Sequence, residues 1–337
     1  MMSRVSRSFA LVVNSLEEPL NYHMATAYLI CRVVDNIEDC TQPFSWQQQR
    51  FDEFEQLLET PENARLILTG WDQEHWPGLT EDEVSMMGLE QGLPLWKIYA
   101  QIPVRYRTSI HHWSSAMAEG MRLIENPEQA PQLIRHKGVQ MLADEEDYNR
   151  YCFFVAGTVG HMATELVIQH YQLNDDIAET LLDTSEACGR GLQKTNILKD
   201  FAEDLQRGVS YLPASWHQEI EYEALALAGA PIEWKHNVID DIVGELRVAT
   251  MYVLALPYTA AGYRMAALMS LLPAYQTLLL AAKKQDTLFT PKHRVKISRP
   301  TMAKCQLNAK SLLKDNEAVR LYSRRLQAEI DSAFAKR

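Results

Sequence analysis

Helical periodicity runs through almost the whole chain and limits it to folds built from packed helices. Apolar residues recur at intervals of three and four, and no sustained stretch alternates apolar and polar residues as a half-buried strand would. Glycine and proline are scarce, with 14 of each in 337 residues, whereas a β-sandwich with many turns normally needs more. We therefore expect an all-α protein. The expected helices cover 17–39, 44–59, 81–91, 103–124, 130–142, 148–171, 175–206, 219–228, 235–255, 258–283 and 302–335.

The expected helices follow one another without a long polar linker. Since no low-complexity segment divides the chain, residues 1–337 are expected to form a single domain. The stretch 248–282 contains one charged residue, Arg264, which raises the question of a membrane span. Pro257 and Pro273 interrupt it, leaving pieces shorter than the roughly 20 apolar residues that a spanning helix needs. We expect buried core helices here, while a peripheral contact with a lipid surface stays open.

Charge and cysteine content restrict the partners and the compartment. With 33 Lys+Arg against 44 Asp+Glu, the net charge of −11 offers a nucleic-acid backbone no general attraction, so no nucleic acid is expected as a partner. The five cysteines form no C-x-x-C pair and indicate neither a disulfide framework nor a zinc knuckle. The apolar stretch 9–13 is too short for a secretory signal. We expect a cytoplasmic protein, with peripheral binding at the inner face of the membrane as the alternative.

The pattern D-x-x-E-D occurs twice, at 35–39 (the first acidic motif) and at 200–204 (the second acidic motif). About 0.7 acidic triples at this spacing are expected by chance, so the informative feature is the recurrence with identical residue types. At about 100° per residue, the carboxylates of the first acidic motif share an arc of about 120° with Tyr28, Arg32 and the apolar Met24. These carboxylates thus extend an apolar stripe that is expected to face inward.

The second acidic motif is expected on a helix with two distinct faces. Its carboxylates share an arc of about 100° with Gln193 and Asn196. The apolar residues Ile197, Leu198 and Phe201 lie on the other side. This helix therefore combines a core face with a separate acidic face.

Carboxylates beside a buried stripe cost free energy unless a cation meets them. Oxygen ligands spaced i, i+3 and i+4 suit Mg²⁺, which binds one or two carboxylates together with substrate phosphates. Two such helices facing each other would hold a diphosphate leaving group between them. The alternative for either motif alone is a solvated charged face. Other catalytic motifs are not indicated, because the chain has no H-E-x-x-H, no G-x-S-x-G, no Walker A sequence and no second E-x-x-H.

Separate blocks of the chain together resemble the squalene/phytoene synthase family, which comprises head-to-head prenyl transferases. The opening S-R-S-F, the Y-C-x-x-V-A-G-x-V-G segment and the L-Q-K-T-N-x-x-K-D-x-x-E-D helix are similar to motifs of this family. The resemblance runs from residue 6 to about 299. The blocks are Ser6–Phe9, Tyr28 with Arg32 and Asp35–Asp39, Tyr148–Gly160 and Leu192–Asp204.

The resemblance implies the isoprenoid synthase fold, with helices around a central apolar cavity, and it assigns roles to individual residues. The implied Mg²⁺ ligands are Asp35, Glu38, Asp39, Asn196, Asp200 and Asp204. The implied substrate contacts are Arg7, Phe9, Arg32, Val155, Gln193 and Lys199. By the same resemblance Tyr151 stands where the family places the proton-removing tyrosine, with Tyr28 next in line.

Two segments resemble squalene synthases more than phytoene synthases. Residues 193–196 read Q-K-T-N, where phytoene synthases usually carry Q-L-T-N, and residues 295–299 read V-K-I-S-R, similar to V-K-I-R-K. The second segment implies NADPH bound with the help of Lys199, Lys296 and Ser298, although Ser298 replaces an arginine. The chain departs from the family in two further respects. Val209 stands where the family usually has arginine, and the nearby Arg207 is a possible substitute. The membrane anchor of eukaryotic squalene synthases is missing, which suggests a bacterial form or a trimmed chain.

The implied reaction is Mg²⁺-dependent condensation of two farnesyl diphosphates to presqualene diphosphate, followed by NADPH-dependent reduction to squalene. The alternative within the family is a synthase that omits reduction and yields presqualene diphosphate, dehydrosqualene or phytoene. The alternative from another class is a non-catalytic helical assembly factor. The oligomeric state cannot be derived from the sequence.

Overall fold

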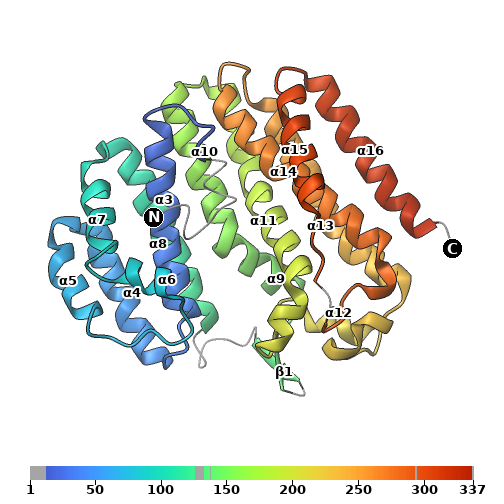
Figure 1. The fold of residues 1–337 in the computed structure, drawn as a ribbon, viewed down its shortest axis with the longest axis horizontal. Helices are drawn as coiled ribbons and strands as arrows, with labels where there is room; N and C mark the ends of the chain where they lie inside the picture. Colours follow the sequence, from blue (N-terminus) through green and yellow to red (C-terminus); the bar gives the residue numbers. More distant parts are fainter. Residues whose placement is uncertain (1–12, 126–132, 137, 293, 336–337) are drawn as a thin grey trace. The chain divides into compact units, whose positions relative to one another are not determined.

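The computed structural model describes residues 13–125, 133–136, 138–292 and 294–335 (Figure 1). Helices dominate these residues, which confirms the expected all-α class. The chain divides into two compact units, an N-terminal unit of residues 1–130 and 161–174 and a C-terminal unit of residues 131–160 and 175–337. The single domain and its central cavity stay predictions.

The N-terminal unit is built around α3 (Leu20–Asp39), which packs against α4, α6, α7 and α8. Twelve of its 20 residues are buried, among them the predicted stripe residue Met24. Large aromatic side chains such as Trp71, Phe54 and Trp96 are almost completely buried in the core of this unit. The other elements are α4 (Phe44–Glu59), η1 (Pro61–Asn63), α5 (Ala64–Trp71), α6 (Glu81–Met87), α7 (Gly92–Gln101), α8 (Val104–Glu125) and most of α10 (Thr158–Tyr171).

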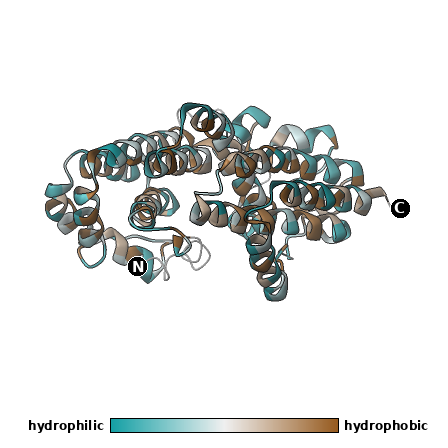
Figure 2. Ribbon diagram, turned by 90° about the horizontal axis from the view of Figure 1, so that it is seen from above, coloured by the Kyte–Doolittle hydropathy of each residue, from teal (hydrophilic) through white to brown (hydrophobic). Residues whose placement is uncertain are grey.

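The C-terminal unit is a helical bundle in which α11 packs mainly on α13, and α14 packs on α13, α15 and α16. Hydrophobic and hydrophilic residues are mixed along the ribbons of these helices (Figure 2). Its helices are α9 (Glu145–Cys152), the π-helix η2 (Phe153–Gly157), α11 (Asp175–Gln206), α12 (Ala214–Glu219), η3 (Ala224–Gly229), α13 (Ile232–Ala255), α14 (Ala261–Lys283), η4 (Gln285–Thr287), α15 (Arg299–Leu312) and α16 (Asn316–Ala335).

The predicted helix over 130–142 is wrong. Its described residues form an antiparallel hairpin of β1 (Leu133–His136) and β2 (Val139–Leu142), and the short β3 (Val209–Ser210) pairs in parallel with β2. Gly138 has φ +87°, a turn conformation that suits glycine and ends any helix. The strands are four residues long, so their alternation is too brief to stand out from the helical periodicity around it.

Two other predicted helices are shorter than expected. The range 219–228 is replaced by α12 and the 3₁₀-helix η3, and the range 302–335 is divided between α15 and α16. At this division, the buried Arg264 donates hydrogen bonds to the carbonyls of Val253, Leu256 (3.1 Å) and Leu313 (2.7 Å). These carbonyls lie at the ends of α13 and α15, where they carry the negative end of the helix dipole. Arg264, the one charged residue of the stretch 248–282, therefore connects the ends of α13 and α15 inside the core.

Within the described residues, two helical stretches are long and apolar enough to cross a membrane, 145–171 and α14. In the apolar window of α14, 61% of the residues are buried within the protein, and the corresponding share for 145–171 is 44%. Core helices of this kind pass the same test as membrane spans. For α14, the burial agrees with the expected core helix.

One close helix contact in the C-terminal unit depends on a glycine of α11. A Cβ atom added at Gly189 would lie 1.9 Å from the carbonyl oxygen of Ala156 in η2. Backbone atoms cannot move aside as a flexible side chain would, so only glycine allows this approach. The approach places the segment 151–157, which carries Tyr151 and Val155, directly on α11.

We expect Gly189→Ala to lower the melting temperature strongly and to displace η2, because a methyl group cannot fit between the two backbones. Gly244→Ala is a matched control, since Gly244 is also helical but a Cβ atom there meets nothing within 4 Å. The control should be neutral or stabilising by about 0.5–1 kcal/mol. Thermal unfolding followed by circular dichroism measures both variants. Equal melting temperatures for the two would contradict the close contact.

Candidate functional site

The first acidic motif lies at the C-terminal end of α3, where an arginine joins it to α6. The Arg32 guanidinium donates to Asp35 Oδ2 (2.8 Å) and to Glu83 Oε1 (2.9 Å). Glu83 is held in turn by a capping box, in which its Oε2 accepts from the backbone and the hydroxyl of Thr80. The buried Asn36 also accepts from Arg32 (3.3 Å). The structure thus brings the predicted residues Arg32 and Asp35 together.

Exposure decreases from the end of α3 inward. Asp39 is exposed and Glu38 is half-buried, as are Tyr28, Arg32 and Asp35. Burial raises the pKa of Asp35 from 3.8 to about 6, and the nearby carboxylates of Asp39 and Glu83 add to the rise, while Arg32 opposes it. The negative charge of Asp35 is thus disfavoured in the protein, and a cation near this carboxylate would lower that cost.

The second acidic motif lies near the C-terminal end of α11 and also meets cationic side chains. Lys199 Nζ lies 2.9 Å from Asn196 Oδ1 and 3.1 Å from Asp200 Oδ2. The guanidinium of Arg294 bridges Asp200 and Glu203, with 2.6 Å to Glu203 Oε1. Here too the structure joins predicted residues, namely Asn196 and Asp200 from the implied metal ligands and Lys199 from the implied substrate contacts.

The last carboxylate of the second acidic motif is the most buried of the motif. The Asp204 side chain is 9% exposed and accepts from the Arg207 guanidinium at 2.6 Å. Burial raises its pKa, while Arg207 opposes the rise. On the adjoining face of α11, Ile197 and Phe201 are buried in the core. The expected division into a core face and an acidic face is confirmed.

One lysine next to this site is fully buried with its counter-ions. Lys194 of the Q-K-T-N segment is 1% exposed, and its Nζ lies 2.9 Å from Asp241 and 3.1 Å from Glu245 on α13. Arg190 shares Glu245 at 3.0 Å. The Lys194 ammonium also faces the Tyr148 ring, 5.1 Å from its centroid. These contacts fix the rotation of α11 against α13, and with it the direction of the acidic face.

Tyr151 lies one helical turn beyond Tyr148, at the end of α9. Its side chain is 6% exposed, and its ring stacks on Tyr211 at 4.6 Å between centroids and 15° between planes. Val155 is half-buried in the π-helix η2, and a π-helical turn is frequent at functional sites. Gln193 is half-buried on α11. These predicted residues belong to one unit together with the second acidic motif.

The remaining predicted residues lie elsewhere or outside the described part. Arg7 and Phe9 belong to residues 1–12, outside the described range. Lys296 is exposed, three residues before the start of α15. Ser298 is the N-cap of α15, and its hydroxyl oxygen accepts from the backbone N–H of Thr301 at 3.2 Å.

Sequence reasoning missed Glu83, Asn36 and Arg294. The signal for Glu83 was a capping box, Thr80 followed by glutamate three residues later, which predicts a helix start but not a partner on another helix. Arg294 directly precedes the predicted 295–299 segment, yet 91 residues separate it from Glu203. Neither contact follows from a local pattern.

The described residues contain no group of three or more His, Cys, Asp or Glu side chains that could hold a metal ion by themselves. Mg²⁺ does not require such a cage, because it keeps several waters and binds through one or two carboxylates plus substrate phosphates. The hard carboxylate oxygens of the two motifs and the raised pKa of Asp35 fit a divalent cation of this kind. Lys199, Arg32 and Arg294 fit the phosphate oxygens.

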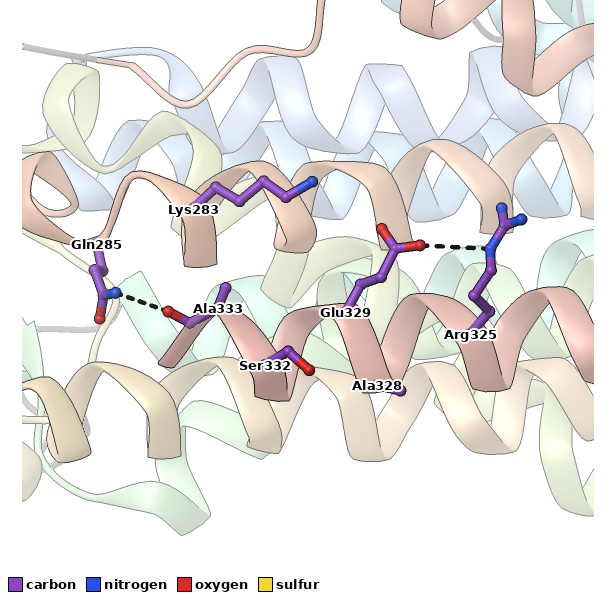
Figure 3. A pocket seen from close by; sticks show the side chains of 7 residues that line it. All are labelled: Lys283, Gln285, Arg325, Ala328, Glu329, Ser332 and Ala333. Atoms are coloured by element: carbon purple, nitrogen blue, oxygen red, sulfur yellow. Dashed lines mark hydrogen bonds and ion pairs between the residues drawn. The ribbon is translucent and has the colours of Figure 1, made fainter. Parts of the chain in front are cut away.

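A separate hollow of about 600 Å³ lies between the ends of α14 and α16 (Figure 3). It is lined by Lys283, Gln285, Arg325, Glu329 and Ser332, together with two alanines of α16. Arg325 and Glu329 pair at 3.5 Å one turn apart on α16, and Gln285 donates to the carbonyl of Ala333 at 3.0 Å. None of the predicted site residues lines this hollow.

Comparison with known proteins gives evidence that is independent of this geometry. The sequence model of squalene/phytoene synthases matches residues 2–301, most of the chain. The chain belongs to the squalene/phytoene synthase family. Membership in this family accounts for the paired acidic motifs and for the helical fold.

Individual relatives specify the activity within the family only in part. The squalene synthase ERG9 of Candida albicans is 29% identical over 215 residues, which is 63% of this chain and 44% of that protein. The chain thus matches less than half the length of this curated relative. The squalene synthase ERG9 of Saccharomyces cerevisiae is 29% identical over 223 residues, 65% of this chain and 45% of that protein.

A solved structure supports the fold. The complex of TcSQS with the ligand BPH1237 superposes with a TM-score of 0.79 and 21% identity, covering 99% of this chain and 94% of that one. At this identity the likeness shows the fold, which agrees with the isoprenoid synthase fold expected from the sequence motifs.

We expect Asp35→Asn to abolish product formation without lowering stability at pH 7.5. The raised pKa means that the folded chain holds this proton more tightly than the unfolded chain. Ionised Asp35 therefore costs stability once the pH rises through about 4 to 6, and the neutral amide removes that cost. Melting temperatures at pH 4 and pH 7.5 and an assay with farnesyl diphosphate measure the two effects. A folded, fully active variant would contradict the metal site, and a large loss of stability would assign the carboxylate a structural role.

Proposed function

We propose that this protein condenses two farnesyl diphosphates head to head, giving presqualene diphosphate, and then reduces this intermediate to squalene. The observation that carries the proposal is that each acidic motif is combined with cations suited to phosphate, Arg32 at the first and Lys199 with Arg294 at the second. A solvated charged face would not bury Asp204 or raise the pKa of Asp35. The arrangement supports binding of a metal diphosphate.

In this proposal, Mg²⁺ would neutralise charge on the leaving diphosphate and NADPH would supply hydride to the second half-reaction. Asp35, Glu38 and Asp39 would hold the metal at the first motif, and Asn196, Asp200 and Asp204 at the second. Arg32, Lys199 and Arg294 carry guanidinium and ammonium groups that can transfer from their present carboxylate partners to phosphate oxygens. Binding would thus exchange one set of ion pairs for another.

Tyr151 is proposed to remove the proton when the cyclopropane ring closes. A free phenol has a pKa of about 10 and is a weak base at neutral pH, so it needs a neighbouring group that accepts or stabilises charge. Its stacking on Tyr211 fixes the ring plane, and the small exposed fraction of its side chain keeps water from competing. Tyr28, half-buried on α3, is the alternative base.

The proposed binding site for a phosphate of the cofactor is the N-terminal end of α15. The exposed Lys296 precedes a helix of 14 residues, whose N-terminal N–H groups and positive dipole end attract phosphate. Ser298 caps this helix through its hydroxyl oxygen, which also shares a hydrogen bond of 2.9 Å with the Thr301 hydroxyl. We propose that this end of α15 binds a phosphate of NADPH.

The second candidate is a synthase without reduction. A dehydrosqualene synthase superposes with a TM-score of 0.60 and 19% identity, covering 93% of this chain and 94% of that one. In addition, Ser298 occupies the position at which the similar segment of squalene synthases has arginine. The Q-K-T-N pattern, which resembles squalene synthases, counts against this candidate. Its lysine, Lys194, is buried with two carboxylate partners.

The decisive experiment incubates the protein with farnesyl diphosphate and Mg²⁺, with and without NADPH, and identifies the lipids by mass spectrometry. We expect squalene with NADPH, presqualene diphosphate without it, and no consumption of substrate after chelation of the metal. Dehydrosqualene or phytoene in both reactions would establish the non-reductive synthase. Unconsumed substrate in the presence of Mg²⁺ would favour a non-catalytic helical assembly factor.

A second measurement tests the cofactor site. Lys296→Ala should slow squalene formation several-fold while presqualene diphosphate continues to form, because its charge serves only the second half-reaction. The accumulation should reverse at higher NADPH concentration. Lys304→Ala, another exposed lysine further along α15, is the matched control and should behave as wild type. Equal losses in both half-reactions would remove Lys296 from the cofactor site.

A further inference from the structure

The end of α3 presents an electrostatic difficulty that the first acidic motif makes worse. The last turn of a helix leaves carbonyl groups without partners, and these form the negative end of the helix dipole. Basic residues usually balance this end, but the last turn of α3 contains none and instead contains Glu38 and Asp39. These carboxylates and carbonyls point their negative charge into the same small region.

A side chain from the next helix satisfies these carbonyls. Gln47 of α4 is 5% exposed, and its amide nitrogen lies 3.2 Å from the Ile37 carbonyl, 3.0 Å from that of Glu38 and 3.0 Å from that of Cys40. The carbonyls of Ile37 and Glu38 belong to the acidic motif itself, and that of Cys40 directly follows it. One neutral donor group thus closes the helix end that carries the carboxylates.

Contacts of the neighbouring residues on α4 hold Gln47 in place. Its neighbour Trp46 donates to Glu74 (3.0 Å), and the buried Arg50 pairs with the same carboxylate at 2.6 Å. The Arg50 guanidinium also lies over the Trp46 ring, 5.0 Å from its centroid. These contacts fix the first turns of α4, so the amide of Gln47 is held at a defined position.

A second segment closes the same helix end from another direction. The backbone N–H of Thr41 donates to the Pro77 carbonyl at 3.0 Å, and a Cβ atom at Gly78 would lie 3.2 Å from the Asp39 carbonyl oxygen. Gly78 has φ +94°, which glycine adopts without strain. The last turn of α3 is therefore enclosed, and Gln47 is the side chain that supplies its hydrogen-bond donors there.

We propose that Gln47 is a positioning residue that sets the affinity of the first acidic motif for Mg²⁺. It orders the backbone from which Glu38 and Asp39 project, so that their oxygens meet the metal without a loss of entropy on binding. A lysine or arginine at this place would satisfy the same carbonyls, but its positive charge would repel the metal. A neutral amide provides the hydrogen bonds without that repulsion. This inference rests on the metal site of the proposed function.

The test measures divalent-metal binding in the folded protein in the presence of inorganic pyrophosphate, which supplies the phosphate ligands that Mg²⁺ takes from the substrate, against a protein-free blank. Mn²⁺, followed by electron paramagnetic resonance and displaced with Mg²⁺, reports the dissociation constant directly. An Asp200→Asn background disables the second motif, so that the signal comes from the first. In this background we expect Gln47→Met to weaken binding about tenfold, as removal of groups that orient metal ligands typically does.

Gln49→Met is the matched control, because Gln49 lies on the same helix but is exposed and bonds only to Glu53 among its described contacts. It should bind metal as the background protein does. If Gln47→Met does not fold, Gln47→Asn keeps the amide on a shorter side chain and should show a smaller loss of affinity. A variant that is less stable but binds metal unchanged when folded would reduce Gln47 to a structural cap and overturn the proposal.

The two hypotheses fail in different ways. If the Asp200→Asn background binds no metal while Gln47 is intact, the first acidic motif is not a metal site, and the proposed function loses its basis together with this inference. If the background binds metal and the Gln47 variants bind it equally well, only the positioning role is overturned. Weaker binding in the Gln47 variants and unchanged binding in the Gln49 variant support both.

Discussion

The balance between clustered carboxylates and the cations that meet them is the interaction on which the rest of the structure depends. The negative charges of the first acidic motif are met by Arg32, and those of the second by Lys199, Arg207 and Arg294. Burial nevertheless raises the pKa values of Asp35 and Asp204 in spite of these partners. Buried carboxylates with raised pKa values are costly for stability and are typical of functional sites.

The surrounding helices serve to keep these charges where they are. Buried Lys194 fixes α11 against α13 through two carboxylates, and the absence of a side chain at Gly189 lets η2 lie on α11. In the N-terminal unit, Glu83 holds Arg32 while belonging to the cap of another helix. Each acidic motif is thus oriented by contacts made on neighbouring helices, which explains why substitutions away from the carboxylates can change the site.

Sequence reasoning worked best where a helix is long and succeeded least where elements are short. The acidic and apolar faces of α11 followed from periodicity alone, because over 32 residues a face repeats many times. The hairpin of β1 and β2 was missed, since four-residue strands alternate too briefly to be distinguished. The partners of Arg32 and Asp200 could not be predicted either. Glu83 and Arg294 are far away in sequence, and proximity of that kind arises only from folding.

The sequence by itself determined the helical class, the family, and which faces carry the carboxylates. These depend on residue types at fixed spacing along one helix, and spacing is a local property of the chain. Only the tertiary structure decided which charges meet, how strongly Asp35 is desolvated and which side chain closes the end of α3. Pairing, burial and capping each join residues from different helices, and their free energies depend on distances that exist only once those helices are packed.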